Sequence, residues 1–180
     1  MQQNKWVALG VWVALSSAAQ AQSNVTVYGL ADLAVEHVRN VGPEGGSLTR
    51  MPGLTGSAAS RLGFRGSEDL GDGLKTVFAL EAGFGMDSGG FNQAGRAFGR
   101  QAWVGLEGRW GALTLGRQYS LLYWSQLEAD ILGANLYSSA SLDHYLPNAR
   151  ADNALAYRGT FHGVTVGLAY SLGRDTVNGG

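Results

Sequence analysis

The sequence predicts an all-β protein whose antiparallel strands form a barrel wall across a membrane. Residues 60–84 show the repeating unit, because two runs with alternating side chains flank a short turn rich in glycine and aspartate. The first residues are typical of an export signal. The connections between predicted strands alternate between long and short, as they do in membrane barrels that place long loops on one side. A soluble antiparallel sheet explains the alternating side chains but not the alternating connections.

The N-terminus predicts export from the cytoplasm. Lys5 supplies a positive charge, residues 6–15 are apolar but too short to span a bilayer as a helix, and residues 16–21 end in an A-x-A site. We therefore expect residues 1–21 to be a signal peptide that is cleaved after Ala21. The mature chain would begin at Gln22, and residues 22–180 would belong to the barrel.

The composition fits a sheet-rich exported protein. No apolar run near 20 residues follows Ala21, and the chain has 28 glycines, 3 prolines and no cysteine. Frequent aromatic residues argue against disorder. The formal net charge of −1 gives no sign of a nucleic-acid partner.

Seven strands are expected from the alternation and from the turn residues. The first runs from Asn24 to Val38 and exceeds the ten residues or so that a tilted strand needs to cross a bilayer. The expected strands are 24–38, 61–67, 75–84, 97–107, 112–119, 150–158 and 164–172. Long loops are expected at 39–59, 85–96 and 120–148.

The two sides of each strand differ in polarity. In the first hairpin Leu62 and Phe64 share one side, whereas Arg61 and Arg65 share the other, which suits a wall between lipid and water. In the next hairpin, residues 97–119, we expect one side of each strand to form part of the outer surface of the barrel. The sequence leaves this assignment open, because the opposite side of the first of these strands is apolar as well. The expected outer residues are Gln101, Trp103, Gly105, Leu113 and Leu115.

The loop 120–148 is the longest irregular stretch. Loops of this length in compact domains are usually functional or disordered. Its aromatic and apolar residues argue against disorder, so we expect a functional loop.

Four sequence blocks resemble the general porins of Gram-negative bacteria, the β-proteobacterial branch above all. In order, they read V-T-V-Y-G-L-A-D, S-R-L-G-F-R-G-S-E-D-L-G-D-G-L-K, F-G-R-Q-A-W-V-G-L and L-T-L-G-R-Q-Y. The resemblance covers nearly all of the mature chain. It implies an outer-membrane channel for passive diffusion of small hydrophilic solutes and ions, built as a homotrimer in lipid with barrels of about sixteen strands.

The resemblance also implies a pore constriction. In such porins the third external loop, here 120–148, folds into the barrel, and wall arginines face carboxylates on that loop. Matching the motifs gives Arg61, Arg100 and Arg150 as wall arginines, and Asp130 and Glu128 as loop acids. A row of arginines stays charged at every relevant pH and orients dipolar solutes in a narrow aqueous slot. The preferred ion sign stays open.

For Arg117 we expect a contact outside the pore constriction. It shares parity with Leu115, so in a regular strand it would point outward, where a charge facing lipid is unfavourable. We expect it to pair with a second-loop acid such as Asp87 of an adjacent subunit. A bulge at Gly116 that turns Arg117 inward is the alternative.

No other chemistry is indicated. His37, His144 and His162 lack metal-ligand spacing, and no nucleophile–base or phosphate-binding motif occurs, so we expect no enzyme, cofactor or metal. A small structural or adhesin-like barrel is the alternative function. Because seven strands do not close such a barrel, we also expect the chain to be the N-terminal half of a porin, from a truncated gene or a partial record, and not to form a stable channel alone.

Overall fold

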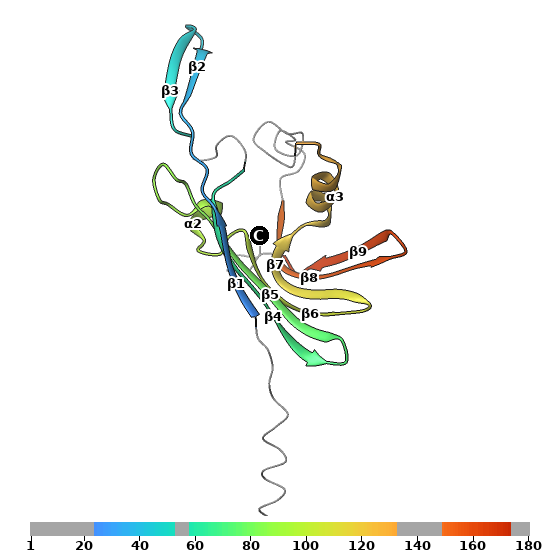
Figure 1. The fold of residues 1–180 in the computed structure, drawn as a ribbon. Helices are drawn as coiled ribbons and strands as arrows, with labels where there is room; N and C mark the ends of the chain where they lie inside the picture. The colour runs from blue at the N-terminus through green and yellow to red at the C-terminus, as the bar shows by residue number, and fades with distance from the viewer. Residues whose placement is uncertain (1–23, 53–57, 133–148, 174–180) are drawn as a thin grey trace, which may run out of the picture.

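The computed structural model describes residues 24–52, 58–132 and 149–173. Its main element is one antiparallel sheet of seven strands, in the order β1-β4-β5-β6-β7-β8-β9. The sheet curves so that β1 and β9 lie at opposite ends, and the barrel is not closed (Figure 1). The strands of this sheet are β1 (Asn24–Leu30), β4 (Arg61–Gly71), β5 (Leu74–Gly83), β6 (Gln101–Gly108), β7 (Gly111–Tyr119), β8 (Arg150–Phe161) and β9 (Val164–Ser171).

The seven predicted strands are confirmed, with corrections at their ends. The first ends at Leu30 instead of Val38, and the fourth begins at Gln101 instead of Ala97. The last hairpin turn shrinks to His162 and Gly163, because β8 continues to Phe161. A turn of two residues needs positive φ, which His162 (50°) and Gly163 (83°) supply.

The expected loop 39–59 contains part of a separate hairpin. Strand β2 (Glu36–Val41) pairs with β3 (Gly46–Arg50), and together they stand clear of the main sheet (Figure 1). The Glu36 carboxylate pairs with Arg50 across the two strands. We expected the first strand to run into β2 because the alternation continues through residues 31–35, but these residues form no strand.

Two helical segments lie in the other long connections. The segment α2 (Asn92–Gly95) is a single turn in which Gln93 and Ala94 have positive φ. Helix α3 (Leu121–Ala129) opens the loop 120–148, which we had expected to be irregular throughout. Its first turn is capped by the Ser120 hydroxyl, which accepts a hydrogen bond from the Tyr123 amide at 3.2 Å. Among the described residues, no helix is long and apolar enough to cross a membrane.

The sheet has one polar and one apolar face. We call the face that carries α3 the inner face, because Leu121 lies against Gly167 and Glu128 pairs with Arg158, which neighbours Gly167 in the β8–β9 register. The opposite, outer face exposes large apolar side chains, among them Val27 (60%), Leu115 (55%) and Leu168 (64%). This division is the one that a wall between water and lipid requires.

The register corrects one predicted face. Val104 pairs with Leu115, and Leu106 pairs with Leu113, so these residues share the outer face. Trp103, which we had placed outside with Leu113 and Leu115, pairs with Gly116 and lies on the inner face, as do Gln101 and Gly105. The side of β6 that carries Gln101 also carries the large indole of Trp103, so the strand pairing was needed to decide between the two sides.

Candidate functional site

The three wall arginines selected from the sequence lie together at the loop end of the inner face. Arg61 pairs with Gly83 in the β4–β5 register. The Cγ and Cδ atoms of Arg100 lie 3.1 and 3.0 Å from where a Cβ of Gly83 would stand, so the missing side chain makes room for Arg100. Arg150 donates from Nε to the Arg100 carbonyl at 2.9 Å. We refer to these three residues as the arginine cluster.

Arg100 is neutralised by the wall itself. Its Nε donates to Glu81 Oε1 at 2.6 Å, and both side chains are buried, with 8% and 5% of their surface exposed. The second carboxylate oxygen of Glu81 accepts a hydrogen bond from the Tyr28 hydroxyl at 2.8 Å. A buried ion pair persists only when its remaining polar atoms are also satisfied, and these contacts meet that condition.

Tyr119 connects the arginine cluster to helix α3. Its hydroxyl accepts a hydrogen bond from Arg100 Nη2 at 2.9 Å, and the Arg150 guanidinium lies 4.9 Å from its ring centroid. Its ring stacks on Tyr123 at 4.9 Å and meets the edge of Trp124 at 5.5 Å. One aromatic side chain therefore holds wall arginines and loop together.

The Tyr123 phenol stays neutral at this site. Burial raises its pKa, and the neighbouring Tyr119 raises it further, whereas Arg150, Arg100 and Arg61 lower it to a smaller extent. The net direction is upward, so Tyr123 contributes no negative charge at neutral pH. The positive charge of the cluster is thus not offset by this loop side chain.

The two predicted loop acids have different surroundings. Glu128 forms an ion pair with Arg158 of β8, whose guanidinium also lies 4.7 Å from the Trp124 ring centroid. Asp130 follows the last residue of α3, and its carboxylate accepts a hydrogen bond from the Leu132 amide at 3.1 Å. A loop acid therefore does face a wall arginine, but that arginine is Arg158, which was not among the predicted wall arginines.

Arg117 lies at an irregularity of the β7–β8 pairing. The β7–β8 register shifts between Gly116 and Gln118, and Gly116 has a φ of 128°. Arg117 forms an ion pair with Asp152 and donates from Nε to the Gly99 carbonyl at 2.7 Å. Asp152 also binds Arg96 at 3.0 Å. The irregularity is an extra residue in β8, because Ala154 to Ala151 lies opposite Gly116 to Gln118. In the regular β6–β7 register Arg117 pairs with Ala102 and keeps the parity of Leu115, as predicted for a regular strand. Its carboxylate partner lies within its own chain.

Asp87 does not contribute to the Arg117 contacts. It is an exposed residue of the second long connection and accepts a hydrogen bond from the Ser88 hydroxyl at 3.3 Å. The pairing of Asp87 with Arg117 across a subunit interface stays a prediction. The ion pair with Asp152 removes the physical reason for it, because Arg117 is already compensated.

Sequence reasoning missed Glu81, Tyr119 and Arg158. Glu81 could have been identified from the sequence, because it is a carboxylate in the middle of the inward-facing side of a strand. Tyr119 and Arg158 were not separable from other aromatic and basic residues, because their roles depend on where α3 lies. Within the part of the chain that the structure describes, no group of three or more acidic, histidine or cysteine side chains could hold a metal ion.

These features define a class of protein, a membrane barrel whose inner face carries charges and an external loop. The chain belongs to the Gram-negative porin family, which it matches over residues 8–180. It is 33% identical to an outer membrane porin protein of Bordetella pertussis, over 92% of this chain and 47% of that protein. It is 35% identical to outer membrane porin protein 32 of Delftia acidovorans, over 92% and 48%.

Solved structures agree with this assignment. The anion-selective porin from Comamonas acidovorans superposes with a TM-score of 0.66 at 30% identity, over 83% of this chain and 47% of that one. OmpTdeltaL8, a loop deletion mutant of the outer membrane protein OmpT of Vibrio cholerae, shares the fold at 17% identity, with a TM-score of 0.61 over 85% and 44%. The chain thus spans about half the length of the relatives it matches.

Proposed function

We propose that this chain forms the part of an outer-membrane channel that carries its constriction, and that small hydrophilic solutes and ions diffuse through the channel. The main observation that supports this proposal is the arginine cluster, which lies beside helix α3 on the inner face of the wall. Loop 120–148 is the segment that narrows the channel. Its residues 133–148 lie outside the described residues.

The proposal includes export, assembly and the absence of catalysis. Residues 1–21, which also lie outside the described residues, direct the chain through the inner membrane and are removed. The complete channel is a homotrimer in outer-membrane lipid and carries out no chemical reaction. Membership of the porin family supports these statements, and a trimer form is known for OmpT of Vibrio cholerae, which shares the fold.

The charges that remain after pairing favour anions. Glu81 neutralises Arg100, and Glu128 pairs with Arg158. Arg61 and Arg150 have no ion pair within the described residues, and they keep their charge at every relevant pH. A narrow aqueous passage beside them attracts anions and repels cations. The 30% identical Comamonas porin is named anion-selective, which supports the same preference here.

Conductance in a planar lipid bilayer tests the proposal. Under a potassium chloride gradient, the complete channel that contains this chain should give a zero-current potential whose sign shows that chloride is the more permeant ion. Arg150→Gln should shift this potential toward zero. Arg109→Gln, which removes the same charge at the β6–β7 turn, should leave it unchanged. A cation preference of the complete channel, or a bilayer without current when that channel is added, would contradict the proposal.

A further inference from the structure

The inner face carries an apolar patch that free diffusion does not require. A water-filled barrel is expected to have a polar interior. Here Trp103, Val77 and Ala112 line one hollow on the turn side of the arginine cluster. Arg65, Lys75 and Glu107 line the same hollow. Its walls therefore combine an indole ring with charged side chains.

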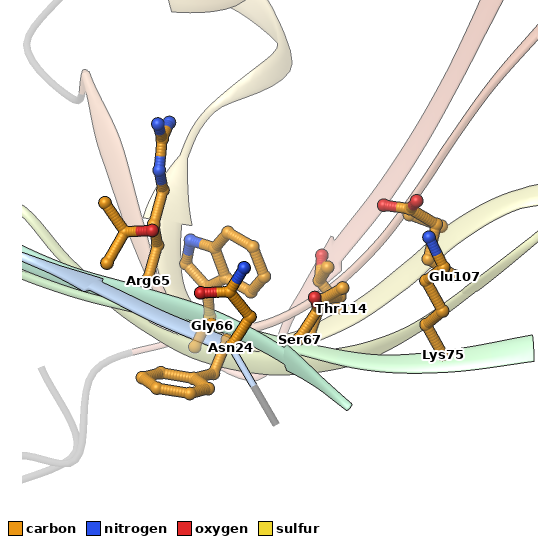
Figure 2. A pocket seen from close by; sticks show the side chains of 12 residues that line it. Asn24, Arg65, Gly66, Ser67, Lys75, Glu107 and Thr114 are labelled. Carbon is orange, nitrogen blue, oxygen red and sulfur yellow. The ribbon is translucent and has the colours of Figure 1, made fainter. Parts of the chain in front are cut away.

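The strand register fixes how these groups are arranged. Arg65 pairs with Ala79, and Ala79 pairs with Trp103. Across the three strands at this level, the methyl group of Ala79 is therefore the side chain between Arg65 and Trp103. Lys75 pairs with Glu107 two side chains further along the same face. Figure 2 shows Arg65 at one end of the hollow and Lys75 with Glu107 at the other, with Ser67 and Thr114 between them.

The charged groups of the hollow are available to a solute. Within the described residues, none of Arg65, Lys75 and Glu107 has an ion pair or a hydrogen-bonded side-chain partner, and all three are exposed. Among the described residues, the Arg65 head group lies against the Tyr28 ring, whose centroid is 5.4 Å from Cζ. A planar guanidinium in this state can bind a carboxylate with two parallel hydrogen bonds.

The spacing of Arg65 and Lys75 favours a solute with one anionic group over a solute with several. Arg65 and Lys75 lie four residue positions apart along the sheet, which is about 13 Å at the rise of a strand. They are too far apart to hold one phosphate together. Lys75 and Glu107 are direct cross-strand neighbours of opposite charge, so their end of the hollow adds little net charge. The site therefore offers one anion contact beside one aromatic surface.

We propose that this hollow binds a small aromatic carboxylate. The carboxylate pairs with Arg65, and the ring lies against Trp103 and Val77, with Ser67 and Thr114 as partners for a polar ring substituent. Strands β4 and β6 are two strand spacings apart, about 9–10 Å, a span that a benzene ring with its carboxylate can bridge between the two side chains. The inference rests on the proposed function, since it names a class of solute for the same channel.

Ligand titrations of the refolded full chain in detergent test this site. Tryptophan fluorescence and calorimetry are recorded for benzoate, for acetate, which lacks the ring, and for benzamide, which lacks the charge. Benzoate should bind about tenfold more tightly than either. Arg65→Gln should weaken benzoate binding about tenfold, and Trp103→Leu about fivefold. Arg109→Gln, at the β6–β7 turn six residues beyond Trp103, should bind benzoate as the parent chain does.

Equal affinities for benzoate, acetate and benzamide in the parent chain would overturn the inference, and this comparison needs no variant to fold. Unchanged benzoate binding by Arg65→Gln would overturn it as well. Conductance separates this inference from the proposed function. Benzoate binding by this chain, when the complete channel carries no current, would retain the site and reject the channel. Current through the complete channel without benzoate binding would reject only the site.

Discussion

At the scale of single residues, the three wall arginines are not equivalent. Arg100 is buried and neutralised by Glu81, so it supports the wall more than it shapes the field in the channel. Arg61 and Arg150 lie beside it without an ion pair among the described residues. Arg100 holds the cluster together through its carbonyl, which Arg150 binds, and through its head group, which binds Tyr119. We therefore assign Arg100 to positioning and the other two to the field.

Replacing the buried carboxylate should destabilise the wall. Glu81→Gln leaves the Arg100 guanidinium buried without a counter-charge, and breaking such a pair costs about 3–5 kcal/mol. We expect a loss of that size in the free energy of unfolding, measured by urea titration of the refolded chain. Glu107→Gln, on the same face but exposed and without an ion pair among the described residues, should change it by less than about 0.5 kcal/mol.

The double variant Glu81→Gln, Arg100→Met sharpens the comparison. It removes both charges, and replacing a buried pair with an apolar side chain is often neutral or stabilising. We expect it to be more stable than Glu81→Gln alone. If Glu81→Gln and Glu107→Gln gave the same stability, the buried pair would not support the wall as we describe.

At the scale of elements, helix α3 is held to the wall by aromatic contacts more than by charge. The pair of Glu128 and Arg158 is partly exposed, at 56% and 37%, and pairs of this kind contribute about 0–1 kcal/mol. Tyr119 contacts two aromatic rings of α3 at once, and each aromatic pair contributes about 0.5–1.5 kcal/mol. The magnitudes favour Tyr119 as the main attachment.

Hydrogen exchange of the α3 amides tests this attachment. Tyr119→Leu should accelerate their exchange about tenfold, because the helix loses its stacking on the wall. Glu128→Gln removes the ion pair but keeps the Arg158 guanidinium over Trp124, so it should change exchange less than about fivefold. A larger effect of Glu128→Gln than of Tyr119→Leu would show that charge holds the helix.

The strands also show which parts of the fold could be predicted from the sequence. The two sides of the β4–β5 hairpin could be predicted, because one side is charged and the turn residues accept positive φ, although β4 continues to Gly71 instead of ending at Ser67. The inner side of β6 could not, since it carries the large indole of Trp103 among its polar residues and the pairing of Val104 with Leu115 is needed to decide. The partners of Arg117 and Glu128 depend on a bulge and on the placement of a helix, which alternation does not encode.

At the scale of the whole molecule, the wall separates two environments. Small and polar side chains, the arginine cluster and α3 occupy the inner face, while the outer face exposes valine, leucine and tyrosine side chains along its strands. In water this arrangement would leave a large apolar surface exposed. It is stable only if lipid covers the outer face and water fills the inner one, which places the proposed diffusion path along the face that carries the arginines.

Thiol labelling of the chain in lipid vesicles tests this division, because the protein has no cysteine of its own. Ser67→Cys places a thiol on the inner face with almost no change in volume, and Leu115→Cys places one on the outer face, where 55% of the side chain is exposed in the isolated chain. A charged, water-soluble thiol reagent should label Ser67→Cys in vesicles. It should label Leu115→Cys only after unfolding in urea, because lipid covers that position. Equal labelling of the two variants in vesicles would show that the outer face is in contact with water, and the membrane assignment of the wall would then be wrong.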